Sequence, residues 1–267
     1  MMEFKDQLGR VIKLAERPTR IVSVVPSQTE LLFDLGLDEE VVGLTKFCVH
    51  PNDKWKSVQR VGGTKKLHFN VIDDLKPDLI IANKEENTQE EIERLAQKYP
   101  VWISDIRSIP AALEMIKQVG ELVGKRGQAI QLADKIQLEW DGLKDKAKEI
   151  KVAYAIWNEP LMLAGNDTFI HEVLTWMGFE NVALKFNDRY PSASSLQLIQ
   201  AEAEIVFLSS EPYPFDESHQ KQFVRKLPQI ERGFPLVDGE MFSWYGSRML
   251  LATAYFKRLL MELSLRR

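Results

Sequence analysis

The sequence predicts an α/β protein of two Rossmann-like lobes, each with a mostly parallel sheet, joined by one long rigid helix. Three observations support this fold class. Short apolar, β-rich runs alternate with amphipathic helical segments along the whole chain. A short helix running into a buried strand occurs once in each half, as "NVIDDLKPDLIIAN" from Asn70 and "SSLQLIQAEAEIVFLSS" from Ser194. A helical segment without proline lies between the two halves.

The first half begins with the apolar run "RIVSVV", which reads as a buried strand. A helix follows, in which Ser27 and Glu30 fit a capping box and Gly36 fits the helix end. Pro110 suits the first turn of a later helix. The expected strands are 20–25, 39–45, 78–82 and 101–103, and the expected helices are 26–36, 70–75, 88–98 and 109–124.

The second half repeats the same alternation. "VAYAIW" is a strong strand candidate, and "TFIHEVLTWMG" reads as a helix that ends at Gly178. The expected strands are 152–157, 161–164, 204–210 and 234–238, and the expected helices are 168–178, 194–200 and 247–265.

Residues 125–149 are expected to form the connecting backbone helix, with lobes at 1–124 and 150–267. Apolar residues such as Ala133, Ile136 and Trp140 recur there at three- and four-residue spacing. About 24 helical residues would extend roughly 36 Å, enough to cross from one lobe to the other. The alternative is an ordinary surface helix.

Composition excludes several classes of partner. A net charge of −4 and a pI of 5.7 argue against nucleic acid and anionic membrane surfaces. The single Cys48 excludes an internal disulfide and a Cys-based zinc site. No apolar stretch suits a signal peptide or a membrane span. We therefore expect a monomer that is cytoplasmic as written, or periplasmic if an export signal was removed.

Catalytic motifs do not stand up to inspection: the chain has no phosphate loop, no G-x-S-x-G elbow and no complete zinc-protease helix. We expect that the protein is not an enzyme and that it has no catalytic residues and no bound metal. An enzyme acting on a chelate, with Glu159 as its carboxylate, is one alternative. Another is a transition-metal receptor that uses the scattered His50, His68 and His171.

Aromatic and polar residues follow the ends of the predicted strands, in "PSQ", "KFCVHP", "GGTKKLHF" and "NKEEN" of the first half. In the second half they lie in "WNEP", "FNDRYPS", "SSEPYPF" and "GEMFSWYGSR". Ligands of parallel α/β sheets bind beyond the carboxyl ends of the strands. Such loops suit a bulky, planar, partly apolar ligand held in a cleft between the lobes.

The segments "RIVSVVPSQTELLFDLGLDEEVVGLTKFCVHP", "VGG" and "LKPDLIIA" resemble the helical-backbone class of periplasmic binding proteins. That family collects cobalamin, haem and ferric siderophores for ABC importers. The resemblance covers nearly the whole chain and is weakest at 185–230. It implies two α/β lobes, a rigid connecting helix and a ligand in the cleft between the lobes.

Within the family the pattern is most similar to the cobalamin receptors, which implies a cobalamin-like corrinoid as ligand. Thr64 and Asn83 occupy two positions where those receptors usually carry tryptophan, and Arg248 matches an arginine that opens the last helix. We expect Tyr245 to face the ligand and Trp244 to pack. The expected ligand-binding residues are Pro26, Ser27, Phe47, Thr64, Lys65, Asn83, Trp157, Asn158, Glu159, Tyr190, Phe242, Tyr245 and Arg248.

Ferric siderophores and haem are the alternative ligands, because cations such as Lys46, Lys65 and Lys84 could bind an anionic chelate. The resemblance also implies an ABC permease as partner, met by one surface glutamate on each lobe. Asn70 and Leu196 stand at those two positions here. This difference suggests a cytoplasmic or uncoupled relative that binds its ligand without delivering it to an importer.

Overall fold

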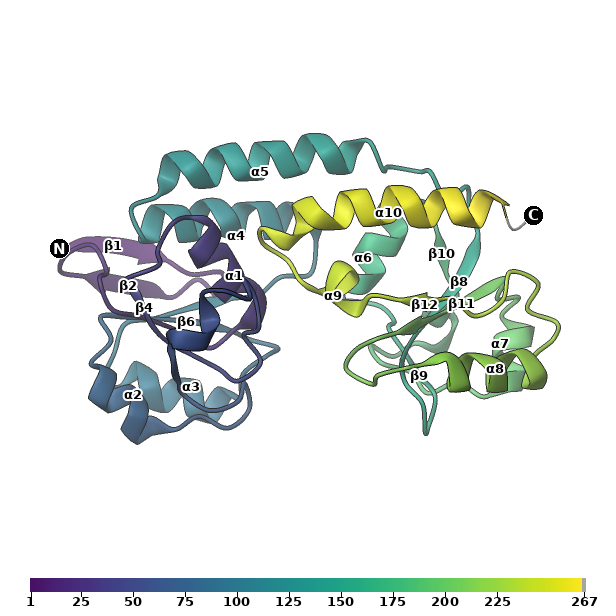
Figure 1. Ribbon diagram of the computed structural model, residues 1–267, viewed down its shortest axis with the longest axis horizontal. Coiled ribbons are helices and arrows are strands. Elements are labelled where there is room, and N and C mark those ends of the chain that lie inside the picture. The colour runs from purple at the N-terminus through teal and green to yellow at the C-terminus, as the bar shows by residue number, and fades with distance from the viewer. Residues whose placement is uncertain (266–267) are drawn as a thin grey trace. The chain divides into compact units, whose positions relative to one another are not determined.

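The computed structural model describes residues 1–265 and divides the chain into two compact units. The first comprises Met1–Ile106, Pro110–Gln137 and Trp244–Met249. The second comprises Arg107–Ile109, Leu138–Ser243 and the C-terminal part of the chain from Leu250. Figure 1 shows strands and helices alternating within each unit. The α/β class with mainly parallel sheets is confirmed.

The first unit contains a parallel sheet with strand order β5-β4-β3-β6-β7 and an N-terminal β1-β2 hairpin. Its strands are β1 (Met2–Lys5), β2 (Val11–Leu14), β3 (Ile21–Ser23), β4 (Val41–Leu44), β5 (Gln59–Arg60), β6 (Leu79–Asn83) and β7 (Val101–Ser104). Its helical segments are α1 (Pro26–Asp34), η1 (Trp55–Ser57), α2 (Phe69–Leu75), α3 (Gln89–Ala96), most of α4 (Ile109–Leu122) and most of α5 (Arg126–Asp141).

Alternation along the strands assigns side chains to the two faces of this sheet. Val22, Ile80 and Ile103 pack with Ile72 of α2 and Ile92 of α3 in one buried cluster. Figure 1 shows α2 and α3 together on that side and α4 on the opposite side. Both faces of the sheet are therefore covered, which explains the unbroken apolar runs of its strands.

The second unit repeats this plan with strand order β10-β8-β11-β12, and β9 pairs antiparallel with β8. Its strands are β8 (Lys151–Trp157), β9 (Met162–Leu163), β10 (Glu180–Asn181), β11 (Ile205–Ser209) and β12 (Leu236–Val237). Its helical segments are α6 (Phe169–Trp176), η2 (Val182–Phe186), α7 (Ser195–Gln200), α8 (Glu217–Lys226), α9 (Gly239–Ser243) and α10 (Arg248–Leu265), the last mostly within this unit.

The repeated helix-into-strand pattern marks equivalent positions in the two sheets. Helix α2 leads into β6, which pairs with β3, and α7 leads into β11, which pairs with β8. Each short helix is followed by a residue with left-handed backbone, Lys76 at φ 48° and Glu202 at φ 59°. The internal echo in the sequence therefore reflects a shared topology.

Two local expectations differ from the structure. Helix α5 ends at Asp141 instead of continuing to 149, because Gly142 and the positive-φ residues Asp145 and Lys148 form turns there. The boundary between the units falls inside α5, after Gln137. The predicted capping box is also wrong: Val25 is the N-cap of α1, and Pro26 is its first residue.

Candidate functional site

The carboxyl ends of β6 and β7 in the first unit are joined by buried polar side chains. The amide of Asn83 donates to the hydroxyl of Ser104 over 2.9 Å, and Gln28 donates to the same hydroxyl. Asn87 donates to the carbonyl of Thr64 over 2.9 Å. Asn83 and Thr64, both expected to contact the ligand, are buried and contribute to holding these loops in place.

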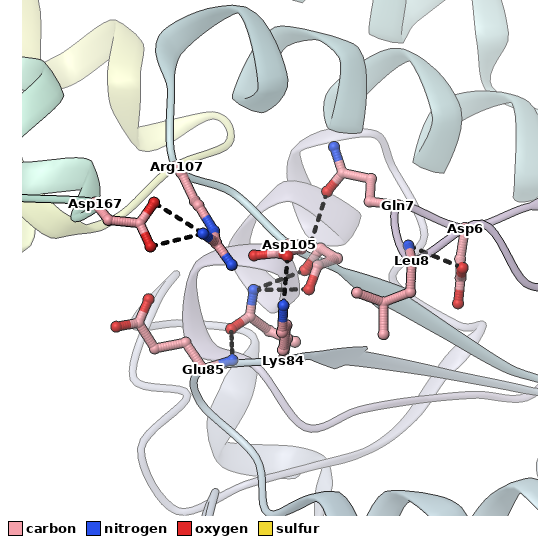
Figure 2. A network of polar contacts seen from close by, with 10 residues as sticks. Asp6, Gln7, Leu8, Lys84, Glu85, Asp105, Arg107 and Asp167 are labelled. Carbon is pink, nitrogen blue, oxygen red and sulfur yellow. Dashed lines mark hydrogen bonds and ion pairs between the residues drawn. The ribbon is translucent and has the colours of Figure 1, made fainter.

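Charged side chains form a second layer at this edge (Figure 2). Lys84 pairs with Asp105 at 2.8 Å, and the side-chain oxygen of Gln7 accepts from the Asp105 backbone at 3.0 Å. Lys65 donates to the carbonyl of Glu85. Burial raises the pKa of Glu86, although the nearby Lys65 charge opposes the shift. Lys65 is thus exposed, and its ammonium group already donates to a backbone carbonyl.

The first turn of α1 contacts the segment 244–249. Tyr245 is buried and hydrogen-bonded to the side chain of Ser27, and burial raises its pKa well above the ordinary value. Trp244 is only half-buried, with its ring 5.5 Å from that of His50. In this structure Trp244 is thus more accessible than Tyr245, the reverse of what we expected. Pro26 is also buried.

Arg248 makes a buried ion pair with Glu30 of α1. Its guanidinium nitrogens Nε and Nη2 lie 2.8 and 2.7 Å from the two carboxylate oxygens. Burial raises the pKa of Glu30, while the arginine acts in the opposite direction. Glu30, expected as part of a capping box, and Arg248, expected as a ligand contact, therefore have each other as structural partners.

Among the predicted ligand-binding residues of the first unit, Phe47 is the exposed aromatic residue. It follows β4, its side chain is 49% exposed, and the Lys46 ammonium lies 4.9 Å from its ring centroid. An apolar face beside a cation suits a planar ligand with an anionic periphery.

Among the predicted residues of the second unit, Trp157 is the exposed ring, and it ends β8. It is 42% exposed, its indole N–H donates to the Glu159 carbonyl over 3.2 Å, and its ring lies 5.5 Å from that of Tyr213. Asn158 is half-buried, with its amide 3.5 Å from the Tyr213 hydroxyl, and Glu159 is exposed. Trp157, Asn158 and Glu159 thus lie together at the carboxyl end of β8.

The other two predicted residues of this unit differ in accessibility. Tyr190 is half-buried, with the Arg189 guanidinium 5.4 Å from its ring centroid. Phe242 is fully buried, with its ring 4.9 Å from Tyr154 and 4.8 Å from Phe256. Phe242 is therefore a core residue of the second unit in this structure and is closed to a ligand.

The loop after β11 holds a polar chain that sequence reasoning missed. The Tyr213 hydroxyl lies 2.8 Å from Nε2 of His219, whose Nδ1 lies 2.6 Å from the Asp216 carboxylate. His219 is not among the residues expected to bind a ligand or a metal. The available signal was its spacing: Asp216 is the N-cap of α8, and His219 occupies the third helical position.

The histidines do not gather into a metal site. His171 is half-buried in α6, where burial lowers its pKa, and Asn181 and Thr175 lie 3.4 Å from its Nδ1. His50 and His68 belong to the first unit and His171 to the second. Among residues 1–265, no three His, Cys, Asp or Glu side chains are grouped so that they could hold a metal ion. Within the same range, no helix has the length and apolar character needed to cross a membrane.

Comparison with known proteins identifies the class. Residues 21–230 match the family model of periplasmic binding proteins, so the chain belongs to that family. Its members are solute-binding proteins and not enzymes, and neither is this chain an enzyme. One relative, from Bacillus subtilis, is named as an ABC transporter substrate-binding lipoprotein, and others are named for vitamin B12 binding or haem binding.

Three relatives illustrate the match. The vitamin B12-binding protein of Vibrio campbellii is 27% identical over 194 residues, covering 71% of this chain and 70% of its own. The vitamin B12-binding protein BtuF of Vibrio cholerae has a TM-score of 0.77 at 18% identity, covering 92% of this chain and 98% of its own. The haem-binding protein RhuT of Roseiflexus has a TM-score of 0.79 at 21% identity, covering 91% and 98%. At these identities the two structures share the fold alone.

Proposed function

We propose that this protein is a receptor that binds cobalamin or a related corrinoid at the carboxyl edge of the sheet that contains β8. The observation that carries the proposal is the exposed indole of Trp157 at the end of β8, with Asn158 and Tyr213 beside it. A large apolar face with hydrogen-bonding groups at its side fits a planar macrocycle with peripheral amides. The relatives named for vitamin B12 binding support the same ligand class.

A binding titration tests the proposal. Cyanocobalamin, cobinamide and ferric haem are titrated separately, with tryptophan fluorescence and ligand absorbance as readouts. We expect cobalamin or cobinamide to quench the fluorescence, and Trp157→Ala to weaken binding by about tenfold or more, as the loss of a central aromatic contact does. Leu251→Ala, which shortens another exposed apolar residue, is the control and should leave binding unchanged. The proposal fails if neither corrinoid changes either signal.

Ferric haem is the second candidate, favoured by the Lys46 ammonium beside the exposed face of Phe47. Haem carries two carboxylates that such a cation can bind, whereas the corrinoid periphery is mainly neutral amide. Thr64 and Asn83 also leave the first edge without two aromatic side chains that cobalamin receptors usually have. A higher affinity for haem than for either corrinoid, reduced by Lys46→Gln, would favour this candidate.

The family places such receptors outside the cytoplasm, because its members serve importers as periplasmic or surface-bound proteins. Of the two expected locations, the family therefore favours the periplasmic one. Fractionation of cells that express the natural gene tests this part of the proposal.

A further inference from the structure

The polar groups beside the exposed ring of Trp157 come from two neighbouring strands of the second unit. Trp157 ends β8, Tyr213 lies in the loop after β11, and these strands are parallel neighbours in the sheet. The centroids of the two rings are 5.5 Å apart. Asn158 and Glu159 follow Trp157 directly in the chain. A ligand that covers the indole is therefore within reach of all these side chains.

The hydrogen-bond donors at this edge already have partners within the protein. The indole N–H of Trp157 donates to the backbone carbonyl of Glu159 over 3.2 Å. The side-chain amide of Asn158 donates to the Tyr213 hydroxyl over 3.5 Å, and that hydroxyl lies 2.8 Å from Nε2 of His219. A ligand therefore meets donors that are engaged before it arrives.

The acceptors at the same edge are available. Within residues 1–265, no group donates to the carboxylate of Glu159 or to the side-chain oxygen of Asn158. Glu159 is exposed and Asn158 is half-buried, so a ligand can reach both. The polar groups left for a ligand beside the Trp157 ring are thus oxygens that accept hydrogen bonds.

The charge of the surrounding loops favours the same kind of ligand group. The loops after β8 (158–161) and after β11 (210–216) contain Glu159, Glu211 and Asp216 but no lysine or arginine. An anionic group brought to this edge gains no salt bridge from either loop and meets charge of its own sign.

We propose that Glu159 makes the receptor selective for corrinoids whose side chains are amides over corrinoids with free carboxylates, with Asn158 as a second acceptor. This inference rests on the proposed function for the ligand class. A primary amide has two N–H donors for the oxygens of Glu159 and Asn158, whereas a carboxylate has none. A carboxylate also has the same charge as Glu159, so it loses these hydrogen bonds and is repelled.

A series of closely matched ligands tests this selectivity. Cyanocobalamin is compared with its monocarboxylic acids, in which one peripheral propionamide is hydrolysed, and with the methyl esters of those acids. We expect at least one acid to bind about tenfold more weakly than cyanocobalamin, the usual effect of losing a hydrogen bond to a charged group. Its ester is neutral but cannot donate, and should have intermediate affinity. Added salt should reduce the difference between acid and ester, because salt screens the repulsion.

Two variants with the same chemical change identify the residue responsible. Glu159→Gln keeps a side-chain oxygen as acceptor and removes the charge, and should lower the acid-to-amide ratio of dissociation constants by about two- to fivefold. Glu231→Gln changes an exposed residue that precedes β12, at the amino end of the parallel strands, and should leave the ratio unchanged. A variant that is partly unfolded binds both ligands less, so a ratio of affinities separates selectivity from folding.

The outcomes distinguish this inference from the proposed function. If every acid binds as tightly as cyanocobalamin, or Glu159→Gln changes the ratio no more than Glu231→Gln does, the role of Glu159 in selectivity is wrong while the receptor function stands. If cyanocobalamin does not bind the wild type, this inference is wrong, and if cobinamide does not bind either, the proposed function is wrong as well.

Discussion

From the family resemblance we expected Arg248 to contact the ligand. In the structure it forms an internal ion pair. Its partner Glu30 lies on α1, 218 positions earlier in the chain, and both side chains are buried. Ion pairs with both members out of water are sensitive to the loss of one member, because the other charge is left buried without compensation.

We therefore expect Arg248→Ala to lower the free energy of unfolding by about 3–5 kcal/mol, measured by urea denaturation. The double variant Glu30→Leu with Arg248→Met should recover much of this loss, because no unpaired charge remains. Lys257→Ala, which breaks the exposed Lys257–Glu139 pair, is the control and should cost less than about 1 kcal/mol. Equal losses for Arg248→Ala and Lys257→Ala would contradict a structural role for the buried pair.

In the segment "GEMFSWYGSR" as well, the sequence did not determine which side chains are buried. Phe242 is fully buried, Trp244 is half-buried and Tyr245 is buried, although all three lie in one aromatic run. The sequence identified an aromatic run at this place in the chain. It could not order the three, because each side chain's accessibility depends on distant residues such as Tyr154 and Ser27.

At the scale of elements, α7 is a short helix whose start is defined by its own sequence. Ser194 accepts from the Gln197 backbone over 3.3 Å, and the Gln197 side chain accepts from the Ser194 backbone over 2.8 Å. This capping box satisfies donors that a six-residue helix has few other means to satisfy. By contrast α1, for which we predicted a capping box, begins with Pro26 and packs most of its length into the core.

Ser194→Ala should lower the free energy of unfolding by about 1 kcal/mol, the usual cost of losing an N-cap side chain. The neighbouring Ser195 is exposed at the first helical position, so Ser195→Ala is a matched control that we expect to be nearly neutral. Chemical denaturation of the two variants side by side makes the measurement. A neutral Ser194→Ala would mean that tertiary packing alone holds α7.

At the scale of the whole molecule, each unit presents a short exposed helix at the position where the resemblance implies a permease contact. Asn70 is exposed on α2, and Leu196 is 62% exposed on α7. The acidic residues after α7 have partners of their own: Glu202 pairs with Lys151, and Glu204 pairs with Arg232 at 3.1 Å. They are therefore poor substitutes for a glutamate at position 196.

We propose that this chain docks weakly on cobalamin permeases for lack of these two charges. Introducing Asn70→Glu together with Leu196→Glu should increase the association rate with a purified cobalamin permease, and the increase should fall with added salt. Leu138→Glu, on exposed surface of α5, adds charge elsewhere and should have little effect. Sub-micromolar docking of the wild type in the presence of ligand would contradict the proposal.

The sequence by itself determined the fold class, the alternation of the main strands and helices, and the repeat of one topology in two units. These features follow from local periodicity, turn residues such as Gly36 and Gly178, and short-range pattern, which are all properties of adjacent residues. The sequence did not indicate the strands β1, β2, β5 and β10 or the helices α8 and α9. Of the predicted ligand contacts, Phe47, which follows β4, and Trp157, the last residue of β8, are both exposed.

The tertiary structure alone decided which candidate residues are accessible and which are paired. Glu30 meets Arg248 across 218 positions, and Phe242 enters an aromatic core. Burial and ion pairing depend on contacts between residues far apart in the chain, and no local pattern encodes them. For this reason the sequence located the edges at which a ligand is proposed to bind, while the fold sorted the side chains at those edges into structural and available ones.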